Sequence, residues 1–149
     1  GRPKVANFTP ENQIFKIGKA IKLQEGNDVT IVATGHLVWE ALQAAEILNE
    51  QGISAEVINI HTIKPLDDEA ILNSISKTRC IVTAEEHNFL GGLGESVARV
   101  LANNNPTPQE FVATQDTFGE SGTPEQLMQK YGLNASAICK AALKVIDRK

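Results

Sequence analysis

The sequence predicts an α/β protein with a mostly parallel sheet covered by helices. Apolar runs at residues 29–34 and 80–84 are typical of strands in the interior of a sheet, and residues 55–60 are expected to form another buried strand. A segment with apolar residues at helical spacing follows each run. Helical connections of this length imply that the strands they join are parallel and that the connections are right-handed. With 149 residues, of which 42% are hydrophobic, the chain has the size and the apolar content of one domain with a core.

The start of the chain predicts a tether and then an edge strand. Residues 1–14 are polar, contain two prolines and show no period, so we expect them to link this domain to a missing upstream domain. The chain begins with Gly1 instead of Met, which suggests a fragment or a processed chain. Apolar and polar residues then alternate over residues 15–23, and this period of two predicts a half-exposed strand at a sheet edge.

Capping residues and helical spacing predict the helices. Asp67 can cap a short helix, Thr123 with Gln126 forms the pattern of a capping box, and Asn134 can cap the last helix. Gly52 stands where a left-handed residue would terminate the first helix. A further strand is expected at residues 110–114, and residues 116–122 are expected to form a loop. The apolar faces of the predicted helices are formed by Val38, Ala41, Leu42, Ala45 and Leu48; Ile71, Leu72 and Ile75; Leu93, Val97, Val100 and Leu101; and Ile138, Ala142, Val145 and Ile146.

Composition argues against several classes of protein. The chain has 14 basic and 18 acidic residues, a formal net charge of -4 and no run of Lys or Arg, which disfavours a nucleic-acid-binding role. Its apolar runs are too short to span a membrane. Cys80 and Cys139 lack metal-ligand spacing and are expected to be reduced core residues. No signal or transit segment is seen, so we expect a cytoplasmic location.

Three histidines, His36, His61 and His87, each come just after a predicted parallel strand. They should therefore lie at one edge of the sheet with Glu85 and Glu86. Imidazoles at such an edge could bind a metal or act as a general base, or they could be loop residues satisfied by backbone or water. The spacings between the three histidines are set by the fold and carry no ligand signature, so we predict no metal site.

The turn formed by Gly91, Gly92 and Gly94 resembles half of a dinucleotide-binding fingerprint, and Gly35 lies in a similar turn after an earlier strand. The amide groups of a helix start could bind an anion, but a helix dipole contributes only about 0.3–1 kcal/mol and micromolar binding needs about 8 kcal/mol. Close packing of helix on strand is the alternative interpretation. The candidate polar edge or anion site comprises Gly35, His36, His61, Glu86, His87, Gly91, Gly92 and Gly94. No nucleophile elbow, Walker loop or paired-cysteine site is present, so no catalytic residue is assigned.

Four separated stretches in order carry a family resemblance: residues 26–35, residues 55–67, the Glu85-Glu86-His87 triplet with the glycine turn, and a closing stretch of residues 118–127 with 131–133. Together they resemble the C-terminal domain of transketolases, over residues 15–145. Deoxyxylulose-phosphate synthases and the beta subunits of 2-oxo-acid dehydrogenases have related C-terminal domains. The form of the triplet and of the Gly119-Glu120-Ser121-Gly122 loop is most similar to transketolases.

The resemblance implies a three-layer α/β/α domain, here residues 15–149, with a mixed five-stranded sheet whose first strand is antiparallel. It also implies an enzyme that uses thiamine diphosphate and Mg²⁺ to move a two-carbon ketol unit between sugar phosphates. In the family two other domains hold the cofactor, through a Gly-Asp-Gly motif that this sequence lacks. We therefore expect no cofactor on this domain, no catalysis by it alone, contacts with the pyrimidine-side and diphosphate-binding domains, and a homodimer of the full enzyme.

Two alternatives to this interpretation stay open. The chain could be an independent module that binds a phosphorylated metabolite or a metal at the polar edge, or it could be a purely structural assembly domain. Binding by the isolated chain that is lost when His87 is changed would favour the module. Self-association of the isolated chain would favour the assembly domain.

Overall fold

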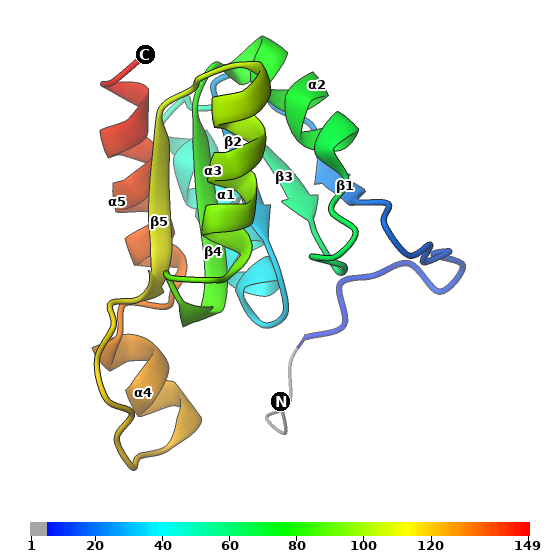
Figure 1. The fold of residues 1–149 in the computed structure, drawn as a ribbon. Coiled ribbons are helices and arrows are strands. Elements are labelled where there is room, and N and C mark those ends of the chain that lie inside the picture. Colours follow the sequence, from blue (N-terminus) through cyan, green and yellow to red (C-terminus); the bar gives the residue numbers. More distant parts are fainter. Residues whose placement is uncertain (1–5) are drawn as a thin grey trace.

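The computed structural model describes residues 6–149 as three layers, a central sheet with helices on both faces (Figure 1). The five strands lie in the order β1-β3-β2-β4-β5. Their bounds are β1 Ile21–Gln24, β2 Val29–Ala33, β3 Ala55–Asn59, β4 Ile81–Asn88 and β5 Gln109–Thr114. The helices are α1 Leu37–Glu50, α2 Asp68–Thr78, α3 Leu93–Asn104, α4 Pro124–Lys130 and α5 Ala135–Ile146.

Two separate cores hold the layers together. On one face, α1 and α5 pack against the sheet through residues such as Leu48 and Ile138. On the other face, α2 and α3 contribute Ile71, Ile75 and Val97. Burial of apolar surface on both faces explains why the central strands are rich in apolar residues. The predicted three-layer class is confirmed.

The sheet is mixed, as expected. β2 pairs in parallel with both β3 and β4, and β4 pairs in parallel with β5. β1 pairs with β3 in the antiparallel sense, with Ile21 opposite Asn59. The carboxyl ends of the four parallel strands therefore meet at one edge, where the candidate site was predicted.

The predicted extent of the edge strand was wrong. The strand was expected over residues 15–23, but β1 covers only Ile21–Gln24. The reason is the length of its partner: β3 ends at Asn59, opposite Ile21, so earlier residues have no backbone to pair with. Phe15 and Ile17, two of the alternating apolar residues, are instead 52% and 81% exposed.

The predicted caps are confirmed. The Asp67 side chain accepts a hydrogen bond from Ala70 N, and Thr123 forms a reciprocal capping box with Gln126. Asn134 accepts a hydrogen bond from Ala137 N at the start of α5. Each cap satisfies a backbone N–H that would otherwise have no partner at a helix start.

The tether predicted over residues 1–14 falls partly on residues 1–5, which lie outside the described part of the chain. Residues 6–20 form neither helix nor strand. They are held against the domain by stacking of Phe8 on Trp39 and by a 2.8 Å hydrogen bond from Gly18 N to the Thr62 hydroxyl.

Cys80 and Cys139 are both free and buried, as the sequence predicted. Within residues 6–149 no helix is long and apolar enough to span a bilayer.

Candidate functional site

The carboxyl ends of β2 and β4 surround a hollow of about 430 Å³ at the sheet edge. Thr34, Gly35 and His36 reach it from the turn that joins β2 to α1, and Ile63 reaches it from the segment after β3. The remaining lining residues come from the end of β4 and the glycine turn, and they are Glu85, Glu86, His87, Gly91 and Gly92. Six of the eight predicted site residues therefore lie together, and the two that do not are His61 and Gly94.

Two polar contacts order this edge. His36 Nδ1 lies 3.8 Å from Glu86 Oε2, which brings the end of β2 next to the end of β4. His87 Nδ1 lies 2.8 Å from the backbone oxygen of Asn88. Both imidazoles are thus held by groups of their own sheet edge.

His61 does not join the other two histidines. Its ring meets the ring of Phe15 edge-on, with 5.0 Å between the ring centroids. Its Nε2 is buried and has no hydrogen-bond partner among the described residues. No group of three or more His, Cys, Asp or Glu side chains in residues 6–149 is placed to hold a metal ion.

The glycine turn is occupied by a carboxylate of the chain itself. Glu85 is only 1% exposed, and it accepts hydrogen bonds from Leu93 N at 2.7 Å and from Gly94 N at 2.8 Å. These two N–H groups begin α3, where the helix dipole favours negative charge. The donors that could have held an external anion are therefore used internally.

The glycines make this contact possible. A Cβ atom on Gly92 would overlap the Glu85 carboxylate, and one on Gly94 would overlap the ring of Phe111. Gly91 instead has a φ of +77° and open space around it, so its role is to turn the backbone. These contacts fit the close-packing interpretation of the glycine turn.

Comparison with known proteins gives the family. The family model described as "Transketolase, C-terminal domain" matches residues 18–138. The chain belongs to the transketolase C-terminal domain family. The chain is also 51% identical over 148 residues to the "6-deoxy-6-sulfo-D-fructose transketolase subunit SqwH" of a Clostridium species, a match that covers 99% of the chain and 46% of that relative.

Other relatives agree. One of the subunits of the apulose-4-phosphate transketolase of Phocaeicola vulgatus is 40% identical over 134 residues, covering 90% of the chain and 43% of that protein. A solved structure titled "Split gene transketolase, inactive beta4 tetramer" superposes with a TM-score of 0.95 at 42% identity, over 99% of this chain and 48% of that one. The chain thus spans about half the length of these relatives.

Deoxyxylulose-phosphate synthases are also relatives. The 1-deoxy-D-xylulose-5-phosphate synthase of Desulforudis audaxviator is 38% identical over 128 residues, covering 85% of the chain and 20% of that enzyme. The transketolase C-terminal domain is therefore shared by enzymes with different products.

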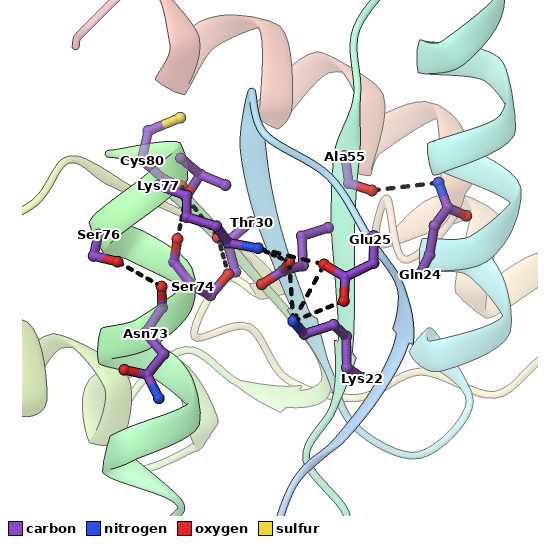
Figure 2. A network of polar contacts seen from close by, with 12 residues as sticks. Lys22, Gln24, Glu25, Thr30, Ala55, Asn73, Ser74, Ser76, Lys77 and Cys80 are labelled. Atoms are coloured by element: carbon purple, nitrogen blue, oxygen red, sulfur yellow. Dashed lines mark hydrogen bonds and ion pairs between the residues drawn. The ribbon is translucent and has the colours of Figure 1, made fainter.

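This transketolase C-terminal domain also contains a polar cluster that sequence analysis missed. Glu56 lies on β3, fully buried, with its carboxylate hydrogen-bonded to Lys77 of α2 and 3.5 Å from Lys22 of β1. Figure 2 shows Lys22, Glu25 and Lys77 converging between the edge strand and α2. The cluster ties three elements together on the face covered by α2.

Hydroxyl groups continue the cluster into the layer between α2 and the sheet. The Thr30 hydroxyl lies 2.5 Å from that of Ser74 and 2.7 Å from that of Thr78. All three side chains are buried, so their mutual hydrogen bonds offset the cost of desolvation.

The charge state of Glu56 follows from its neighbours. Burial alone would raise the pKa of this carboxyl, but the side-chain hydrogen bonds with Lys77 and Ser74 and the charge of Lys22 outweigh burial and hold the pKa of Glu56 below its usual value. An acid inside the buried run of residues 55–60 was the only signal of this cluster in the sequence.

Proposed function

We propose that this chain is the C-terminal domain of a thiamine-diphosphate-dependent transketolase that transfers a two-carbon ketol unit between sugar phosphates. The observation that carries the proposal is the match at 51% identity with a protein named as a transketolase subunit, over nearly the whole chain and about half of that subunit. The role proposed for the domain is assembly of the enzyme, with no catalytic residue of its own.

The polar edge supports an assembly role better than a cofactor site. Thiamine diphosphate carries a diphosphate group, and two carboxylates, Glu85 and Glu86, line the hollow at this edge. Glu85 also occupies the helix-start amides that would otherwise attract a phosphate. The residues present do not fit the cofactor, and we propose that thiamine diphosphate and Mg²⁺ bind the pyrimidine-side and diphosphate-binding domains of the complete enzyme.

The complete enzyme is proposed to be a cytoplasmic homodimer or a larger assembly built from it. Two buried free thiols are typical of a reducing compartment. A related split-gene chain is described as a tetramer, and this chain would contact the rest of its subunit in a similar assembly.

The test is an assay of the complete enzyme that contains this chain. We expect thiamine-dependent transfer of a ketol unit from xylulose 5-phosphate to ribose 5-phosphate or to another aldose phosphate. Decarboxylation of pyruvate without ketol transfer would contradict the proposal and assign the domain to a deoxyxylulose-phosphate synthase or a 2-oxo-acid dehydrogenase.

A calorimetric titration of the isolated chain separates assembly from binding. We expect no saturable heat with thiamine diphosphate, with ribose 5-phosphate or with Mg²⁺. Saturable binding that is lost in His87→Ala and kept in the control Lys140→Ala would favour the independent binding module instead.

A further inference from the structure

Exposed apolar side chains gather at the carboxyl edge of the sheet. Within residues 6–149, eight large hydrophobic residues are exposed, and six of them lie on segments at this edge: Ile14, Phe15, Ile17, Ile63, Leu90 and Phe118. Loops normally carry polar residues because their surface faces water. Apolar side chains that gather on one side of a molecule mark an interaction surface.

Phe118 is the extreme case, with 98% of its surface exposed. It lies in the loop between β5 and α4, and α4 itself buries no residue in the domain. Figure 1 shows this loop and α4 projecting from the body of the domain, at the end where the described part of the chain begins. A phenylalanine at such a position buries almost no surface when the domain folds, so it stays available for a contact outside the described residues.

Side-chain contacts nevertheless tie the loop to neighbouring elements. The Tyr131 hydroxyl donates a hydrogen bond of 3.3 Å to the Phe118 backbone oxygen. The Asn88 amide donates one of 3.0 Å to Asp116, and Lys130 pairs with Glu120. A large aromatic side chain on a loop that is tied at its backbone suits an anchor, because less backbone entropy is lost on binding.

Two observations indicate what binds this surface: the relatives are about twice as long as this chain, and the loop of Phe118 is acidic. The relatives carry about as much chain again beyond the matched region, and that remainder requires a contact surface on this domain. The loop of Phe118 and the start of α4 carry three acids, Asp116, Glu120 and Glu125, with Lys130 as the cation paired with Glu120. This pattern fits an apolar pocket with a basic rim.

We infer that Phe118 anchors this domain in such a pocket on the remaining half of its own subunit. The inference rests on the proposed function and adds to it the residue and the surface chemistry of the contact. Leu90 and Ile63 are further exposed apolar side chains on segments at this edge.

The inference is tested by cysteine labelling of the complete subunit. Cys80 and Cys139 are buried, so a maleimide should label Phe118→Cys selectively within this domain, and peptide mass spectrometry locates the label. We expect Phe118→Cys to react at least about tenfold more slowly in the complete subunit than in the isolated chain. Ile47→Cys is the matched control, since Ile47 is 39% exposed on α1, and it should react equally fast in both.

Equal rates for Phe118→Cys in the two proteins would overturn the inference. Protection in the isolated chain that increases with its concentration would also overturn it, because the occupant would then be a second copy. If Phe118→Cys is protected in a complete subunit that lacks ketol transfer, the inference stands and the proposed function fails. If ketol transfer is present and Phe118→Cys is unprotected, only the inference fails.

Discussion

Glu85 closes the amino terminus of α3 by accepting a 2.8 Å hydrogen bond from the backbone N–H of Gly94. The carboxylate is buried, and its second oxygen accepts from Leu93 N. An acid at the end of β4 thus stands where other α/β proteins bind a phosphate. This contact fixes both the glycine turn and the hollow beside it.

Removing this carboxylate should destabilise the domain. In Glu85→Ala two buried N–H groups lose their acceptor, and we expect the free energy of unfolding to fall by about 2–4 kcal/mol. Urea denaturation measures the change. Glu86→Ala is the control because Glu86 is exposed at the same strand end, and it should change stability by less than about 0.5 kcal/mol. An equal loss in both variants would contradict the proposed role of Glu85.

The same variant should acquire an affinity for anions. With Glu85 shortened to alanine, the N–H groups of Leu93 and Gly94 become available at a helix start. We expect millimolar sulfate to raise the melting temperature of Glu85→Ala by more than that of the native chain. Sodium chloride at equal ionic strength corrects for general salt effects. A sulfate response equal to that of the native chain would show that Glu85 does not occupy an anion position.

Gly94 should tolerate no side chain. A Cβ atom there would overlap the Phe111 ring, and we expect Gly94→Ala to cost about 1–3 kcal/mol because α3 must move away from β5. Gly119→Ala is the matched control, since no atom lies within 4 Å of the position of its Cβ. Thermal unfolding compares the two variants. A stable Gly94→Ala domain would mean that α3 is not packed closely on β5 at this position.

The Glu56–Lys77 pair should make the free energy of unfolding depend on pH. Because the folded-state pKa of Glu56 is depressed, its contribution is present above the unfolded value of about 4.3 and is lost as the pH falls through the folded pKa. In Lys77→Met burial is opposed only by the hydrogen bond with Ser74 and the charge of Lys22, so the loss of stability should begin at a higher pH. We expect a cost near pH 7 of about 1–2 kcal/mol, since solvent screens the partly exposed lysine.

Denaturation curves between pH 3 and 8 measure this effect. Lys144→Met is the control, because Lys144 pairs with Glu110 at the surface and the pair should contribute less than about 1 kcal/mol. Identical pH profiles for Lys77→Met and the native chain would contradict the assignment.

Both thiols should be inert in the folded domain. Burial raises the pKa of Cys80 and of Cys139, which lowers the fraction of reactive thiolate. We expect neither to react with Ellman's reagent at pH 8 until urea unfolds the domain, and then both to react together. Rapid reaction of one thiol under native conditions would show local opening of α5 or of the segment before β4.

Sequence alone predicted the elements whose patterns are set by local chemistry. Largely apolar segments indicated three of the buried strands, and the caps at Asp67, Thr123 and Asn134 indicated three of the helix starts. The extent of β1 could not be predicted, because it depends on where β3 ends across the sheet. The alternating apolar residues Phe15 and Ile17, which were interpreted as part of a strand, lie instead in an exposed segment without regular structure.

The candidate site was predicted in part for a similar reason. Topology brings His36 and His87 to one hollow, because β2 and β4 are neighbours. His36 follows β2 as expected, but His87, which was expected just after a strand, lies within β4 because that strand continues to Asn88. His61 follows β3 but turns toward Phe15, a contact made by a segment without regular structure. The structural roles of the buried acids Glu56 and Glu85 were missed. In the sequence they look like surface acids, and only their hydrogen-bond partners in the fold distinguish them.

The short antiparallel strand β1 also has a consequence for solubility. A parallel sheet ending at β3 would expose a row of unpaired backbone groups to other chains, and such rows template aggregation. β1 covers that row with only four residues and carries Lys22, and at the opposite border Arg148 donates a hydrogen bond to the backbone oxygen of Gln109 in β5. Both borders of the sheet thus carry a cation, which disfavours strand pairing with another molecule.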